Sequence, residues 1–175
     1  MKKLTLITLL SAIAAAPTFA ASGDTSTGAV VFSGFVPGFV ANGDVIITGA
    51  GGNMDSAAYT GSLLVNNDGT FSSTPVVLEA RDYTGATVGN LTTANWTVSQ
   101  VMVIPAAMSE VQPNIVVGDR VSATELTATD YLSSTQLAAG ETIQLYVSNN
   151  TAHSTPDDIA GTEVSVNVDL VATLP

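Results

Sequence analysis

The chain has 175 residues, of which 46% are hydrophobic and only 11% are charged, and its formal net charge is −11. So acidic a surface repels phosphate groups, which makes nucleic acids and anionic lipids poor partners. The chain contains no cysteine, so neither a disulfide nor a thiolate metal site can stabilise it. Valine, threonine and glycine are abundant while lysine and glutamate are scarce, which predicts an all-β protein.

The N-terminus has the pattern of a secretory signal. Residues 1–3 are positively charged, residues 4–16 are apolar, and residues 18–20 offer small side chains at the positions that a signal peptidase reads. The apolar run is too short to cross a membrane, so we expect cleavage after Ala20 rather than anchoring. Cleavage would leave 155 residues, enough for one domain, with two arginines against fifteen acidic residues and a net charge of −13.

A strand-like run follows at residues 27–36 and ends at the Pro37-Gly38 break. Strand side chains alternate between two faces, and one face here carries Val30, Phe32, Gly34 and Val36. A glycine inside an apolar row weakens a strand and often marks a place where another group packs very closely. The run is therefore predicted to do more than fill an ordinary core.

The pattern Gly-x-Val-x-Phe-x-Gly-x-Val at residues 28–36 resembles the N-terminal extension of chaperone–usher fimbrial (pilus) subunits of the major pilin type. In that family the extension enters an incomplete immunoglobulin-like β-sandwich of the neighbouring subunit, which lacks its last strand. The resemblance implies a donor strand at residues 21–36 and an incomplete immunoglobulin-like β-sandwich at residues 37–175. Many members carry a cysteine pair and a penultimate aromatic residue, whereas this chain has no cysteine and ends in Leu174-Pro175.

The resemblance also implies a place and a set of partners. The protein would be exported through the periplasm to the cell surface and would form a fimbria that supports adhesion or biofilm formation. Its partners would be copies of itself or sibling pilins, a periplasmic chaperone and an outer-membrane usher. The alternative is a self-contained secreted β-sandwich, a carbohydrate-binding or biofilm-matrix protein, in which residues 28–36 complete their own domain.

The rest of the chain is predicted to form eight to ten short strands separated by turns, the spacing of a β-sandwich. We expect strands at residues 39–41, 44–48, 57–65, 70–73, 76–80, 86–91, 95–104, 115–117, 142–147 and 163–170. Trp96, Val98 and Met102 are taken to define the faces of the middle strand, and Trp96 is expected to lie in the core. Residues 122–137 favour neither helix nor strand. The last strand alternates most clearly, with Val164, Val166, Val168 and Leu170 on one face.

No group of residues has the pattern of a catalytic or metal site, so we predict no enzyme activity, no cofactor and no metal. The only histidine, His153, lies in a loop by composition and is expected to be exposed, and no serine has the Gly-x-Ser-x-Gly setting of a nucleophile. Residues 66–68 and 157–158 could offer oxygen ligands to calcium, but turn formation explains both clusters better. Residues 66–69 in particular have the sequence of a hairpin turn.

Overall fold

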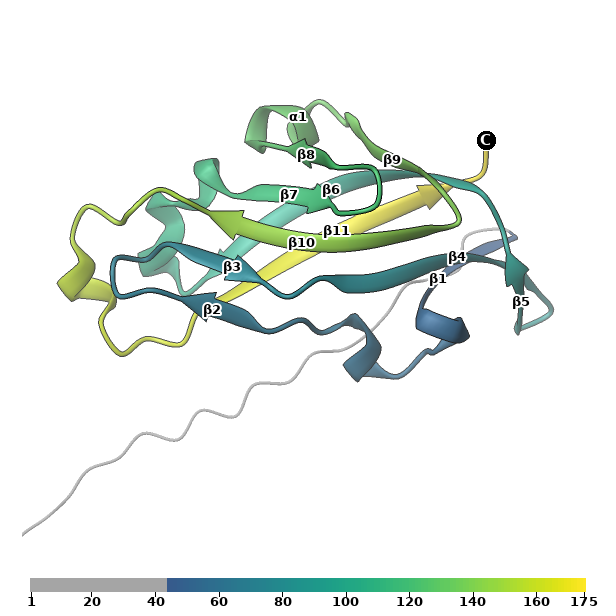
Figure 1. The fold of residues 1–175 in the computed structure, drawn as a ribbon, viewed down its shortest axis with the longest axis horizontal. Coiled ribbons are helices and arrows are strands. Elements are labelled where there is room, and N and C mark those ends of the chain that lie inside the picture. The colour runs from purple at the N-terminus through teal and green to yellow at the C-terminus, as the bar shows by residue number, and fades with distance from the viewer. Residues whose placement is uncertain (1–43) are drawn as a thin grey trace, which may run out of the picture. The chain divides into compact units, whose positions relative to one another are not determined.

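The computed structural model describes residues 44–175, which form two open antiparallel sheets and one short α-helix (Figure 1). The strands are β1 (Val45–Gly49), β2 (Leu63–Val65), β3 (Phe71–Ser73), β4 (Val76–Thr84), β5 (Thr87–Leu91), β6 (Ala94–Ile104), β7 (Val116–Asp119), β8 (Thr124–Leu126), β9 (Gln136–Gly140), β10 (Thr142–Asn149) and β11 (Ser165–Thr173). The helices are α1 (Ala128–Leu132) and the short 3-10 turns η1 (Ala50–Gly52), η2 (Ser56–Tyr59), η3 (Ala106–Glu110), η4 (Gln112–Asn114) and η5 (Pro156–Ile159).

This architecture confirms the expected all-β class. Within the described part of the chain, no helix is long and apolar enough to cross a membrane. The expected signal, the expected donor strand with Val30, Phe32, Gly34 and Val36, and the expected strand at 39–41 all lie outside the described residues.

The larger sheet is organised around β10. One edge of β10 pairs with β4 along residues 142–145 and with β3 along residues 148–149, so β3 and β4 act as one interrupted strand. The other edge of β10 pairs with β7, and β7 pairs with β8. Beyond β4 and β3 lie β1 and β2, which form the outermost row of the sheet, and β5 folds back onto β4.

The smaller sheet has the order β11-β6-β9, with β6 in the centre. The pairing of β6 with β11 slips by one residue between Gln100 and Val98, which leaves Ser99 as a β-bulge. Because of the bulge, Trp96 and Val98 face the core before it and Val101 and Val103 face the core after it. Met102 consequently points outward and is 41% exposed. Of the three residues expected to define the faces of this strand, Trp96 and Val98 therefore mark the core face and Met102 marks the outer face.

Both sheets contribute side chains to one hydrophobic core. Trp96 on β6 is fully buried. Its indole N–H donates to the backbone carbonyl of Gly140 at 2.9 Å, which ties β6 to the end of β9. Leu78 on β4 and Ile143 on β10 supply the opposing sheet and are equally inaccessible. The expected core position of Trp96 is confirmed.

Two expected segments differ from the structure. Residues 57–65 do not form one strand, because 56–59 form the turn η2 and the strand β2 begins only at Leu63. The undecided region 122–137 contains β8, α1 and β9. There the carboxylate of Asp130 accepts hydrogen bonds from the backbone N–H and the hydroxyl of Thr127, each at 2.7 Å, and so fixes the start of α1.

A buried carboxylate joins β7 to β10. Asp119 is only 1% exposed, and its two oxygens accept backbone N–H groups of Gln144 (2.7 Å), Ser122 (2.8 Å) and Val121 (3.1 Å). Burial by itself raises the pKa of Asp119, but these hydrogen bonds outweigh the burial and hold the pKa below its ordinary value of 3.8. Asp119 therefore works as a charged clamp on the end of β7.

We expect Asp119→Asn to lower the free energy of unfolding by about 1–3 kcal/mol at neutral pH, because one carboxylate oxygen becomes an NH₂ group that faces backbone donors. Since the native pKa is lowered, the carboxylate stabilises the fold fully above 3.8, and this contribution is lost as the pH falls through the native pKa. The difference between wild type and variant should therefore shrink below about pH 4 in urea unfolding curves. The exposed Asp157→Asn is the control; an equal effect of both variants would contradict the clamp.

Candidate functional site

The described residues hold no group of three or more His, Cys, Asp or Glu side chains that could bind a metal ion. His153 lies in a loop as expected, but the expectation of exposure is wrong, because only 8% of it is accessible. Its Nδ1 accepts the backbone N–H of Thr155 at 3.2 Å, and its Nε2 lies 2.9 Å from the carbonyl oxygen of Ala107. Nε2 thus holds the loop against η3, while Nδ1 fixes the backbone of the loop itself, and together these contacts explain the burial.

The residues considered as calcium ligands serve turns. The Asp68 carboxylate accepts the backbone N–H of Thr70 at 3.0 Å and its hydroxyl at 2.7 Å, and these hydrogen bonds lower the pKa of Asp68. Gly69 follows with φ +83°, a conformation that favours glycine. The hairpin predicted at 66–69 is therefore confirmed between β2 and β3, and residues 157–158 lie in η5.

A second carboxylate, Glu79 on β4, organises the loop after β1. Its oxygens accept the backbone N–H groups of Gly51 (2.9 Å) and Gly52 (3.1 Å), and Arg81 pairs with it at 2.7 Å. Burial raises the pKa of Glu79, but the hydrogen bonds from Gly51, Arg81 and Gly52 outweigh it and leave the pKa lowered. Both Glu79 and Arg81 are therefore engaged within the fold.

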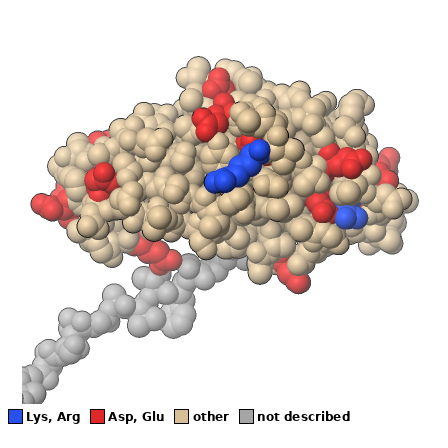
Figure 2. Space-filling view, in the orientation of Figure 1, with Lys and Arg blue, Asp and Glu red and all other residues tan. Residues whose placement is uncertain are grey.

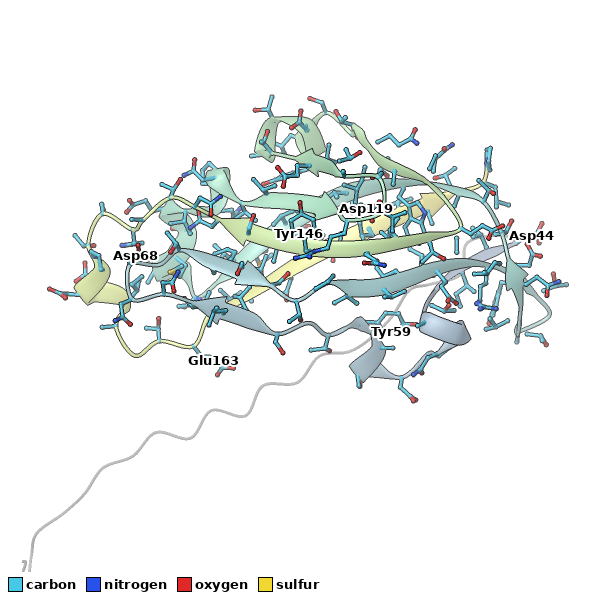
Figure 3. The ribbon with its side chains drawn as sticks, viewed as in Figure 1. Asp44, Tyr59, Asp68, Asp119, Tyr146 and Glu163 are labelled. Carbon is cyan, nitrogen blue, oxygen red and sulfur yellow. The ribbon has the colours of Figure 1, made fainter. Side chains whose placement is uncertain are left out.

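Tyr146 and its neighbours form a polar cluster on the outer face of the larger sheet, where Figure 3 labels Tyr146 and Asp119. The Tyr146 hydroxyl donates to Glu125, which raises the pKa of Tyr146 to about 12, and the Arg120 guanidinium lies 5.5 Å from the ring centroid. The ring lies over Gly118, where a Cβ atom would come within 2.4 Å of it. The cluster is a cation–π stack between Arg120, which follows β7, and Tyr146 on β10, and the hydrogen bond to Glu125 links it to β8.

The two sides of the molecule differ in how the sheets end. On one side β8 and β9 approach each other, and α1 contacts β6 and β8. Leu126, Tyr131 and Leu137 from these elements are buried, so this side of the core is closed.

The other side is open along the C-terminal strand. Among the described strands, β11 pairs only with β6, so its second edge carries no ladder. Side chains of β11 alternate between exposed and core-facing positions, as its sequence predicts. Among the core-facing side chains of this strand, only Leu170 is buried. Val164, Val166, Val168 and Ala172 contact the core and remain half-buried.

On this side the larger sheet also has half-buried apolar side chains along its outermost strands. Its outermost row is β1 followed by β2, and β1 contacts β11. Half-buried apolar side chains that pack against the core come from this row as well: Val45, Tyr59, Leu63 and Val65. We call these four residues together with Val164, Val166, Val168 and Ala172 the apolar edge.

The sequence pattern pointed to part of this site. The period-two alternation identified Val164, Val166 and Val168, but the turn η2 hid the contribution of Tyr59 and Leu63. No protein-family model, curated protein or solved structure matches the chain. The features that point to a function are the edge of β11 with which no described strand pairs and the apolar edge beside it.

If the apolar edge is open in the isolated chain, truncating one of its residues should cost little. We expect Val168→Ala to lower the free energy of unfolding by less than about 1 kcal/mol, whereas Val98→Ala, whose side chain is 1% exposed, should cost about 2 kcal/mol. Chemical denaturation of both variants measures this. Equal losses would mean that a further strand covers β11 within one chain.

Proposed function

We propose that the protein is a structural subunit of a bacterial surface fimbria whose subunits polymerise by donor-strand exchange. The observation that carries this proposal is the edge of β11 with which no described strand pairs, beside the half-buried apolar edge. An unpaired strand edge is a template for an added strand, because its backbone N–H and C=O groups lack partners. The half-buried side chains beside it gain further burial when such a strand arrives.

The segment at residues 28–36, which the sequence predicts to be a strand, has properties that suit this place. It is nine residues long, as is β11, and both have an apolar residue or glycine at every second position on one face. Val30, Phe32 and Val36 would each be worth about 1.5–3 kcal/mol when buried, or roughly 5–9 kcal/mol together. Gly34 would sit where the acceptor leaves no room for a side chain.

The fold supports the proposal at a coarser level. Two open antiparallel sheets around one core are compatible with an immunoglobulin-like sandwich that lacks a strand next to β11. A subunit with such an edge needs protection before assembly, since free edges promote aggregation. A periplasmic chaperone that covers the edge, an outer-membrane usher and delivery to the cell surface follow as parts of this proposal.

Deleting residues 21–36 tests the proposal, because in this scheme the deletion removes the donor and leaves the acceptor intact. We expect the truncated subunit to form no fibres and to unfold at a higher temperature when a peptide of residues 28–36 is added. A peptide with Gly34→Leu should bind less tightly, by about 1–3 kcal/mol, because added volume at a packed interface costs energy. Thermal unfolding across a peptide titration gives both values.

A peptide with Ser33→Leu is the matched control, since residue 33 lies on the opposite face of the strand and should have a milder effect. A truncated protein that aggregates and is not rescued by any donor peptide would instead favour the self-contained secreted β-sandwich, in which residues 28–36 belong to their own domain.

A further inference from the structure

The outer face of the smaller sheet carries mostly uncharged polar and apolar side chains. The register of β6 with β11 and β9 assigns twelve residues to this face: Asn95, Thr97, Gln100, Met102, Ile104, Gln136, Ala139, Ser165, Asn167, Asp169, Val171 and Thr173. Ten of them are exposed, and only Asn95 and Thr97 on the central strand are half-buried. Because most of these residues are exposed, no described strand or helix covers this face.

Charge is almost missing from this face. The described residues include fourteen acidic side chains and two arginines, yet Asp169 is the one charged residue among the twelve. Figure 2, which looks from the side of the larger sheet, shows acidic groups and both arginines spread over the opposite surface. The acidic residues are therefore unevenly distributed between the two sheets.

Apolar side chains occur where the charge is missing. Met102, Ile104 and Val171 are 41%, 42% and 45% exposed, and all three lie on this face. Depletion of charged residues combined with exposed methionine and aliphatic side chains is the composition of an interface core rather than of a solvated rim.

We propose that this face is a lateral association surface, on which the same face of a second copy in a neighbouring fibre docks. This inference rests on the proposed function, because it assumes that the subunits form a fibre. Two strongly acidic copies repel each other wherever their carboxylates meet, and this face brings the fewest carboxylates together. A two-fold arrangement satisfies the contact, because the same residues then serve both partners.

The size of the face favours a copy in another fibre over a stable dimer. With eleven residues in its longest strand and three strands across, it measures roughly 35 Å by 14 Å, or about 500 Å². A pair would bury about 1,000 Å², which is the lower limit for a specific interface. One contact is therefore weak, whereas two parallel fibres repeat it at every subunit and gain avidity.

The first experiment uses the absence of native cysteine. In the full chain, Gln100→Cys puts one thiol on this face, and Leu64→Cys puts one on β2, where residue 64 is 70% exposed. With a bismaleimide linker, we expect Gln100→Cys to form covalent dimers at least about fivefold faster than Leu64→Cys. Equal rates would overturn the inference, whether the sample contains fibres or single subunits.

The second experiment changes charge. Asp169→Asn removes the single charge of the face, and Asp157→Asn removes one charge from η5. In low-speed sedimentation of assembled fibres, we expect Asp169→Asn to increase the bundled fraction and Asp157→Asn to change it little. Met102→Glu should reduce bundling by about fivefold, with Leu64→Glu as the control of equal charge. Higher salt should strengthen wild-type bundling, because it screens the repulsion between acidic copies.

Bundles that respond equally to Met102→Glu and Leu64→Glu would overturn the lateral surface. Fibre length on denaturant-free gels is a separate readout. If no variant and no wild-type sample polymerises, the proposed function fails, while the cross-linking rates of Gln100→Cys and Leu64→Cys still decide the lateral contact between single subunits.

Discussion

A β-sheet edge has to be paired, covered or otherwise protected, because each of its residues presents backbone groups that seek partners. On one side of this protein the sheet edges are covered, because β8 and β9 contact each other and α1 packs against β6 and β8. On the other side, the second edge of β11 has no partner among the described strands, since β11 pairs only with β6. Val166 and Val168 are half-buried, because they pack against the core while no described strand pairs with the second edge of β11.

Several acidic side chains hold backbone groups in place. Asp119 accepts three backbone N–H groups at the end of β7, and Glu79 accepts two from the turn after β1. Asp130 fixes the start of α1 in the same way. In a chain without disulfides these carboxylates define turns and strand ends that packing alone leaves free, and their lowered pKa values follow from those hydrogen bonds.

Two faces of the molecule thus have different chemistry. The apolar edge lies beside the edge of β11 that no described strand pairs with and suits an added strand, whereas the outer face of the smaller sheet carries a single charged residue and suits another surface with few charges. A fibre built through the first surface would repeat the second along its length. Under the two proposals, substitutions of Gly34 should change polymerisation, and substitutions of Met102 or Asp169 should change lateral association.

The sequence by itself determined the all-β class, most strand positions, the hairpin at residues 66–69 and the alternation of the last strand. These features depend on neighbours in the chain, such as β-branched residues at period two and Asn-Asp-Gly turns. Only the tertiary structure decided the outward position of Met102, the burial of His153 and the open state of the apolar edge. Met102 depends on a one-residue slip against β11, and His153 depends on the carbonyl of Ala107, 46 residues away. The apolar edge depends on which strands pair, so no local pattern contains it.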